Sequence, residues 1–207
     1  MNIHNSIKVE NTDFVSNLKI AQNVNQIIIV SANGNTANVL MYNKNTEGVW
    51  KAIFIAPGYI GKNGIGKTKE GDMKTPTGIY HFTDAFGIKQ NPGTELEYVQ
   101  VDDSYYWVDD YNSVYYNKFV SSKNVNRDWV SAENILSIGK AYNYVLALDY
   151  NVERVPGKGS AIFLHCSTGN PTAGCISVQE EYMIKILKEI KKGCIIIIDK
   201  ENNINNY

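Results

Sequence analysis

The sequence predicts a β-rich α+β domain with mixed strand pairing and one late helix. Its apolar runs, such as residues 27–30 and 195–198, have the length of strands. Links rich in Asn and Gly separate the apolar runs in the first half of the chain, as in sheets built from hairpins. Only residues 179–192 combine an apolar stripe at helical spacing with matching charges at both ends. A length of 207 residues suits one domain.

The first strands follow from short apolar runs and turn-forming links. Residues 26–31 predict a strand, and Asn33-Gly34-Asn35 predicts the turn into the next one. Residues 37–42 and 49–56 predict a hairpin, because the link between them is rich in Asn and contains Gly48. The sheet is therefore expected to begin with strands that follow one another directly.

The middle of the chain is expected to be mostly loop. Residues 57–78 hold six glycines and two prolines, and residues 78–83 predict a short strand after them. Residues 87–130 are rich in Tyr, Asn and Asp with mixed periodicity, so we expect long excursions over a surface. A helix is expected at residues 132–140, with Ser131 as its N-cap.

The last third predicts the buried strands and the helix. Residues 144–150 and 160–166 are dense apolar runs of the kind found in buried central strands. In the helix at residues 179–192, an apolar stripe is formed by Met183, Ile184, Leu187 and Ile190. Gly193 suits the position after the helix, and residues 194–199 predict a final strand.

Charge and hydropathy argue against several classes of partner. Lys and Arg number 20 against 21 Asp and Glu, which gives a net charge of −1. Such a chain has no global field to attract nucleic acid or an anionic membrane. No apolar run approaches the ~18 residues that a membrane span needs. We therefore expect neither nucleic acid as a partner nor a membrane-spanning segment.

The three cysteines do not form a disulfide framework, because their number is low and odd. Cys166 and Cys194 belong to predicted strands, where a free cysteine usually packs as a small apolar residue. Cys175 lies in a Gly-containing loop, so simple burial explains it less well.

One stretch matches a phosphate-binding string but lacks the structure that such a site needs. Residues 61–68 fit G-x-x-x-x-G-K-[ST]. The mechanism requires the Lys-Thr pair to open a helix whose first amides bind phosphate. Gly71 and Pro76 leave no room for two helical turns after Thr68. We therefore expect a Gly-rich surface loop and no nucleotide.

His165 and Cys175 carry the clearest indication of chemistry. His165 ends a predicted strand, and a turn-forming link then returns the chain to Thr172-Ala173-Gly174-Cys175. Cysteine nucleophiles need an imidazole within reach to take or hold the thiol proton. Gly174 lets a substrate carbonyl approach closely and permits unusual backbone angles, so that amides can point at an oxyanion.

Other interpretations of these residues are weaker. A lone His is usually a satisfied core residue, but a Gly-Cys loop follows His165 at short range. A metal held by His165, Cys166 and Cys175 is not expected, because adjacent strand residues point to opposite faces. The order His then Cys disfavours papain-like peptidases. Both arginines, Arg127 and Arg154, precede the Gly-Cys pair, which is unlike the order His, Cys, Arg in sortases.

Two segments around this pair, Ala161-Ile162-Phe163-Leu164-His165 and Pro171-Thr172-Ala173-Gly174-Cys175, resemble the L,D-transpeptidase (YkuD-type) catalytic domain family, in its subgroup with a His…PTAGC signature. Other segments that agree with it are Gly61-Lys62-Asn63-Gly64, Gly71-Asp72, Thr75-Pro76-Thr77-Gly78, Asn91-Pro92-Gly93-Thr94, Tyr106-Trp107-Val108-Asp109-Asp110, Tyr115-Tyr116-Asn117 and Asp149-Tyr150-Asn151. The resemblance implies a mixed, sandwich-like sheet with the late helix packed on it. It divides the chain into an N-terminal extension (1–24), a catalytic domain (25–200) and a C-terminal tail (201–207).

Two positions depart from the family pattern. The second His of the family, just before Gly-Cys, is Ala173 here, which removes a polar group near the oxyanion. The Arg or Asn found two residues after the Cys in many members is Ser177 here, which removes a possible anchor for a substrate carboxylate. Both changes concern donor specificity, whereas the nucleophile and the base are retained.

The resemblance implies a cysteine acyltransferase that acts on peptidoglycan stem peptides without cofactor or metal. Cys175 would attack the carbonyl of the third, diaminopimelate-type residue of a tetrapeptide, and an amine of a second stem would resolve the thioester into a 3→3 cross-link. His165 would be the base, with its ring oriented by the Cys166 carbonyl, and the amides of Gly174 and Cys175 would stabilise the oxyanion. Imidazolium pairing would lower the Cys175 pKa from about 8.5 to roughly 4–7.

Two alternatives remain open. Water in place of the amine would give an L,D-carboxypeptidase, and a wall-binding module would hold glycan-peptide with its aromatic residues without turnover. The implied substrate lies outside the cytoplasm, on the cell-wall or periplasmic side. Residues 1–15 lack the basic and apolar stretches of a signal peptide, so we expect that an export signal has been removed.

Overall fold

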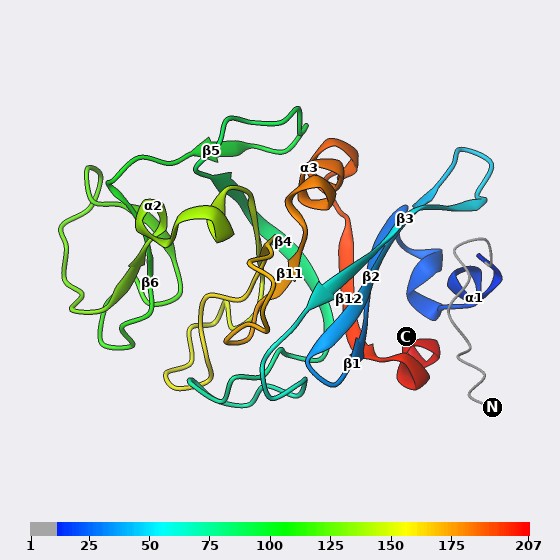
Figure 1. Cartoon of the computed structure of the whole chain (residues 1–207), viewed down its shortest axis with the longest axis horizontal. Helices are drawn as coiled ribbons and strands as arrows, with labels where there is room; N and C mark the ends of the chain where they lie inside the picture. Colours follow the sequence, from blue (N-terminus) through cyan, green and yellow to red (C-terminus); the bar gives the residue numbers. More distant parts are fainter. Residues whose placement is uncertain (1–11) are drawn as a thin grey trace.

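The computed structural model describes residues 12–207, and strands dominate its secondary structure. The strands are β1 (Gln26–Asn33), β2 (Thr36–Lys44), β3 (Trp50–Tyr59), β4 (Gly78–Gly87), β5 (Tyr98–Gln100), β6 (Tyr105–Val108), β7 (Phe119–Ser121), β8 (Ala132–Asn134), β9 (Val145–Leu148), β10 (Phe163–Cys166), β11 (Ile176–Val178) and β12 (Ile195–Lys200). The helices are α1 (Asp13–Ser16), α2 (Ile135–Ile138) and α3 (Glu180–Glu189), with 3-10 turns η1 (Lys19–Gln22), η2 (Gly139–Tyr142) and η3 (Glu201–Asn206). In Figure 1, α1 and η3 lie at one end of the molecule and β6 and α2 at the other.

The main sheet is mixed and closes on itself. Its order is β12-β1-β2-β3-β11-β10-β9-β4-β5, and an additional β12–β4 pairing joins all strands except β5 into a ring. β1 runs parallel to β12 and β10 parallel to β11, whereas β2 is antiparallel to both of its neighbours. A β-rich, mixed α+β fold with one late helix was predicted, and the structure confirms it.

The predicted first strands and hairpin are present, and β3 and β4 are longer than predicted. β2 and β3 pair antiparallel from Lys44↔Trp50 to Thr36↔Tyr59. β3 continues to Tyr59, and its last residues pair with β11, where Ser177 lies opposite Tyr59. β4 reaches Gly87 because its second half pairs with β9. The extension of β4 depends on a strand that lies far away in the sequence, whereas the end of β3 pairs both with its neighbour β2 and with the distant β11.

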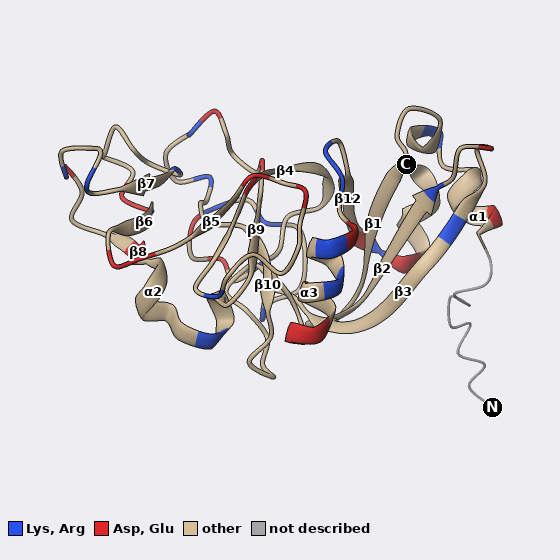
Figure 2. Ribbon diagram, turned by 90° about the horizontal axis from the view of Figure 1, so that it is seen from above, with Lys and Arg blue, Asp and Glu red and all other residues tan. Residues whose placement is uncertain are grey.

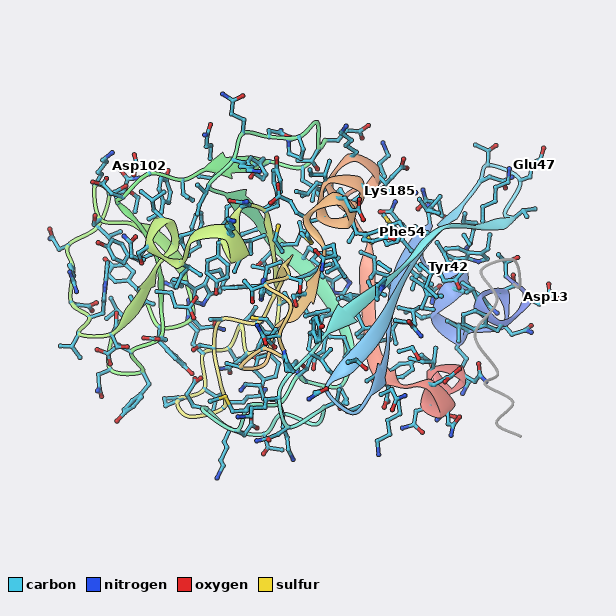
Figure 3. All side chains as sticks on the ribbon, viewed as in Figure 1. Asp13, Tyr42, Glu47, Phe54, Asp102 and Lys185 are labelled. Carbon is cyan, nitrogen blue, oxygen red and sulfur yellow. The ribbon has the colours of Figure 1, made fainter. Side chains whose placement is uncertain are left out.

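Helix α3 packs its apolar stripe inside the curved sheet. Met183, Ile186 and Leu187 are fully buried in a cluster with the inward residues of β1, β2, β10, β11 and β12. On its outer side, Lys185 lies beside Phe54 of β3, with Nζ 5.5 Å from the ring centroid (Figure 3). No helix within residues 12–207 has the length and hydropathy of a membrane span, α3 included.

The C-terminal end of α3 is set by a side chain from β1. The helix ends at Glu189 rather than at the predicted Lys192. The Gln26 amide donates to the Glu189 carbonyl at 2.8 Å and accepts from the Lys191 amide at 2.7 Å. Gln26 is 4 % exposed, so it satisfies helix-end groups that water does not reach.

The two terminal segments cover the outer face of β1, β2 and β12. Val15, Leu18 and Ala21 pack there with Ile204 and with the outward isoleucines of β1 and β12. Residues 12–24 and 201–207, which sequence reasoning treated as an extension and a tail, therefore contribute to a buried apolar layer.

A small second sheet, β7-β6-β8, covers the outer face of β4, β9 and β10. The two sheets meet in an aromatic cluster that includes Phe86, Trp107 and Phe163. The ring centroids of Trp107 and Phe163 are 4.7 Å apart. The predicted helix at residues 132–140 is wrong in its first part, because Ala132–Asn134 pair with β6 as strand β8. The N-cap of α2 is Asn134, which accepts from the Ser137 amide at 3.0 Å, and not Ser131.

Candidate active site

Strand β10 sends its residues alternately into the core and toward a cavity. Leu164 and Cys166 point into the inner core with α3, whereas Phe163 packs in the outer aromatic cluster and His165 lines the cavity. His165 and Cys166 thus lie on opposite faces, as strand alternation requires. Ser177 of β11 is paired in register with His165 and lines the same cavity.

Cys175 immediately precedes β11, in a turn that hydrogen bonds hold tightly. The Thr172 hydroxyl donates to the Cys175 carbonyl at 2.6 Å and accepts from the Gly174 amide at 3.1 Å. Gly174 has φ +151°, and a Cβ there would lie 2.9 Å from the Lys74 carbonyl oxygen, so no other residue fits without a shift. Because the Gly174 amide is engaged, the Cys175 amide is the remaining candidate for an oxyanion donor.

The Cys175 sulfur contacts the backbone of the segment that leads into β10. It lies 3.2 Å from the Ala161 carbonyl oxygen, to which the thiol donates, and 3.4 Å from the Phe163 amide nitrogen. Burial, followed by the charge of Glu133, raises the pKa of Cys175 to about 12. The expected lowering of this pKa by His165 is therefore wrong for this structure, which describes a neutral resting thiol.

Asn117 holds the Ala161 backbone in place. Its Oδ1 accepts from the Ala161 amide at 3.1 Å and from the Trp107 indole nitrogen at 3.0 Å. Its Nδ2 donates to the carbonyls of Tyr150 and Asn151 at 2.9 and 3.0 Å. Both Asn117 and Ala161 have φ +53°, a strained value for residues with a side chain. The Asn117 side chain therefore connects β6 and residues 150–151 to Ala161, the residue whose carbonyl contacts the thiol.

The His165 ring is oriented by backbone and by an aromatic neighbour. Its Nδ1 is 2.9 Å from the Cys166 carbonyl oxygen, so Nδ1 carries a hydrogen and Nε2 is the basic nitrogen. The ring of Tyr142 meets it edge-on at 5.5 Å. Burial lowers the pKa of His165, against the opposing effect of the Cys166 and Ala141 carbonyls. The imidazole is therefore neutral and able to accept a proton near pH 7.

His165 and Cys175 face one cavity of about 280 Å³. Its lining includes the turn that contains Thr172, Ala173 and Gly174, and it also includes acidic side chains. These acidic residues are Glu70, Asp109 and Glu133. The cavity thus combines a thiol, a neutral imidazole and a negative wall.

A search of protein families matches the L,D-transpeptidase catalytic domain, YkuD, to residues 25–198, most of the chain. The chain belongs to this family. No curated protein matches the sequence. The match covers both β10 and the turn at Cys175, so the pair found here lies within the family's catalytic domain.

Several solved structures resemble this L,D-transpeptidase domain at low identity. The helical cell shape determining protein Pgp2 from Campylobacter jejuni has 16% identity and a TM-score of 0.46, over 85% of this chain and 48% of Pgp2. L,D-transpeptidase 1 of Mycobacterium tuberculosis has 13% identity and a TM-score of 0.39, over 84% of this chain and 61% of its own. L,D-transpeptidase (Yku) from Stackebrandtia nassauensis has 13% identity and a TM-score of 0.37, over 85% of this chain and 56% of its own. This chain therefore spans about half to three fifths of these longer chains, and family membership rests on the family match.

The phosphate-loop string has another role in this L,D-transpeptidase domain. No helix follows Thr68, and residues 60–77 form turns and bridges beside the site. The Lys67 ammonium is 3.1 Å from an Asp72 carboxylate oxygen, with both side chains buried. Thr75 accepts from the Gly61 amide at 2.8 Å and lies 3.4 Å from the Cys175 carbonyl oxygen. This loop supports the turn that carries the cysteine.

Sequence reasoning found the thiol and the imidazole but missed the residues that surround them. Thr75 and Asn117 were noticed only as parts of matching segments, and neither had an assigned role. Tyr142 and Glu133, joined by a hydrogen bond of 2.5 Å, were not singled out. Glu133 lies in the predicted helix at residues 132–140, and Tyr142 lies between that helix and the next predicted strand, so nothing in the sequence placed them in this cavity.

Proposed function

We propose that this domain is a cysteine acyltransferase that forms 3→3 cross-links between peptidoglycan stem peptides. Support comes from one observation above all: the Cys175 thiol and the His165 imidazole line the same cavity in a chain of the L,D-transpeptidase family. An enclosed thiol beside a neutral base suits nucleophilic catalysis better than passive binding of the wall.

In the first half of the proposed reaction, His165 Nε2 accepts the thiol proton as the Cys175 sulfur attacks the carbonyl of the third stem residue. A carbon–sulfur bond forms, and the oxyanion is stabilised by the Cys175 amide. The bond to the D-alanine nitrogen then breaks, and the imidazolium protonates that nitrogen. The products of this half are a thioester on Cys175 and free D-alanine.

In the second half, the neutral amine of another stem attacks the thioester carbonyl. His165 takes a proton from the attacking nitrogen, and the carbon–sulfur bond breaks. The proton then returns to the sulfur, which restores the thiol. If water attacks instead, the same site gives an L,D-carboxypeptidase, so the acceptor decides the activity.

The experiment that tests this proposal follows the thioester and its products. We expect mass spectrometry to detect loss of D-alanine from a tetrapeptide and a dimer linked 3→3, and a carbapenem to acylate Cys175. A Cys175→Ala variant should give none of these while it keeps its melting temperature. Trimmed monomer alone would indicate a carboxypeptidase, and no adduct with either reagent would support a wall-binding module and overturn the proposal.

The proposed substrate also sets the proposed location. Stem peptides are cross-linked outside the cytoplasm, so we propose that this domain works at the cell wall or in the periplasm. Fractionation of cells that express the native gene would test this, and a protein found only in the cytosol would contradict it.

A further inference from the structure

Three acidic residues from distant parts of the chain meet in the wall of the cavity. Glu70 comes from the loop before β4, Asp109 follows β6, and Glu133 lies in β8. Acidic positions of the ribbon are red in Figure 2, where they include the region of β6 and β8. We call these three residues the acidic wall.

Within the described part of the chain, no Lys, Arg or His forms an ion pair with the acidic wall. Glu133 accepts from the Tyr142 hydroxyl at 2.5 Å, and Glu70 accepts from the Ser160 hydroxyl at 3.1 Å. Lys67 lines the same cavity, but its ammonium group forms an ion pair with Asp72. The wall therefore keeps a net negative charge that hydrogen bonds from neutral groups do not cancel.

This arrangement is electrostatically unfavourable for Glu133, which is half-buried like Asp109, whereas Glu70 is exposed to solvent. Burial raises the pKa of Glu133, and the nearby charges of Asp109 and Glu70 raise it further. A buried oxygen of Asp109, Oδ1, has no hydrogen-bond partner among the described residues. Buried carboxylates are usually paired with cations or donors, and unpaired ones reduce stability.

A second, independent feature of the cavity also indicates a ligand. The Ser177 hydroxyl has no hydrogen-bond partner within residues 12–207, although the residue is 1 % exposed. Ser177 lines the cavity beside His165, two residues after Cys175. A buried hydroxyl that finds no partner in the protein has a donor and acceptor available for a bound molecule.

We propose that the acidic wall binds a primary ammonium group of the stem peptide, with the Ser177 hydroxyl as a further polar contact for the same substrate. This subsite rests on the function proposed above and extends it. An ammonium group is the ligand that matches the wall, because it supplies a positive charge and three donors to carboxylates.

A bound ammonium also has a consequence for the nucleophile. The charge of Glu133 opposes ionisation of Cys175, and a substrate cation beside Glu133 would cancel that effect. Occupation of the subsite would thus ease removal of the thiol proton when a substrate is present. In the free enzyme the thiol would stay protonated.

Two ammonium groups of the reaction have this chemistry. One is the side-chain ammonium of the third residue in the donor, and the other is the amine of the acceptor stem before it loses its proton. Rates of thioester formation and of thioester resolution distinguish them, because only the donor is present in the first step.

The experiment compares a donor tetrapeptide that has a free side-chain amine with the same peptide acetylated at that amine. In the parent enzyme we expect faster acylation by the free amine, and we expect added salt to reduce this preference. In Asp109→Asn with Glu133→Gln, acylation by the free amine should slow about tenfold or more. Acylation by the acetylated donor should not slow, because loss of the Glu133 charge favours the thiolate. Glu47→Gln, which removes one exposed negative charge from the β2–β3 hairpin (Figure 3), is the matched control for the single variant Asp109→Asn.

The outcomes separate the two sources and the two proposals. If the double variant resolves the thioester more slowly but is acylated at the parent rate, the subsite binds the acceptor amine. Equal rates for both donors and both steps in the parent and the double variant would overturn the subsite and leave the transpeptidase proposal intact. If the parent is not acylated at all, the transpeptidase proposal fails. In that case, calorimetry with Nα-acetyl-lysine amide tests the acidic wall. The parent should bind this compound and the double variant should not. No binding by the parent would overturn the proposed subsite.

The melting temperature of each variant is measured in parallel, so that a loss of activity caused by unfolding is recognised. Removal of mutually repelling carboxylates should leave the melting temperature unchanged or raise it. The single variant Asp109→Asn provides a milder change of the same kind. Should either variant slow both donors equally, the wall supports the fold and does not bind an ammonium group.

Discussion

The Cys175 thiol donates a hydrogen bond to the Ala161 carbonyl, with 3.2 Å between sulfur and oxygen. A thiol that donates to a carbonyl is protonated, and burial raises its pKa to about 12. The free protein thus keeps the proposed nucleophile neutral. Burial lowers the pKa of His165, so this side chain is also neutral, and the proposed proton transfer between them takes place only when substrate is bound.

Alkylation of Cys175 should be slow near neutral pH. Because only the thiolate reacts, the iodoacetamide rate should rise with pH well beyond pH 9, where an ordinary thiol has already levelled off. Peptide mapping after timed alkylation gives this rate for Cys175 alone. A plateau below pH 8 would mean that His165 ionises the thiol in the free enzyme.

Glu133→Gln should speed alkylation of Cys175 at a fixed pH. The carboxylate raises the thiol pKa, so its removal lowers that pKa and increases the thiolate fraction. Glu47→Gln removes an equal charge from the exposed β2–β3 hairpin and should have no effect. An unchanged rate in Glu133→Gln would show that its charge does not reach the sulfur.

Cys166→Ala should keep most activity, whereas His165→Ala should not. The Cys166 sulfur lies in the inner core, so its loss should cost about 1 kcal/mol of unfolding free energy. Loss of the His165 imidazole removes the proposed general base, a change that typically lowers the rate about 10²–10⁴-fold. Activity and thermal melting are measured on both variants. An inactive Cys166→Ala of parental stability would place its side chain in the site.

Gln26→Ala should destabilise the fold without changing the chemistry. Its amide bonds the Glu189 carbonyl, the Lys191 amide and the Asn43 side chain, all away from the cavity. Loss of these buried bonds should reduce the free energy of unfolding by about 2–4 kcal/mol. Urea unfolding measures this loss, and the acylation rate at low temperature should match the parent. A loss below 0.5 kcal/mol would show that water can replace the side chain.

ATP should not bind at residues 61–68. Lys67 is buried against Asp72, and no helix follows Thr68 to present amides to a phosphate. Calorimetry with ATP should give no heat of binding. Micromolar affinity that disappears in Lys67→Ala would contradict this expectation.

Local patterns predicted the parts of the fold that depend on neighbours in sequence. The β2–β3 hairpin and α3 were predicted because turn residues and an apolar stripe lie within one short window. The end of α3 and strand β8 were not, because Gln26 and β6 determine them from far along the chain. Periodicity cannot show which distant partner a segment will find.

The same distinction holds for the site. His165 and Cys175 could be proposed from the sequence because one short link joins them. The acidic wall could not, since Glu70, Asp109 and Glu133 come from three separate segments and have no shared spacing. Asn117 is a related case, because its importance depends on the Ala161 amide, which only the fold brings to it.

The pairing of β1 with β12 has a consequence for how the chain reaches its native state. Ile27 lies beside Ile195, so the ring joins strands from nearly opposite ends of the sequence. Such non-local contacts require a large loss of chain entropy before they contribute stability, and they make folding slow. During synthesis, β1 must remain without its parallel partner until the last strand leaves the ribosome. Its isoleucines, buried in the finished ring, lack the cover of the β12 strand during that period, which makes β1 vulnerable to aggregation.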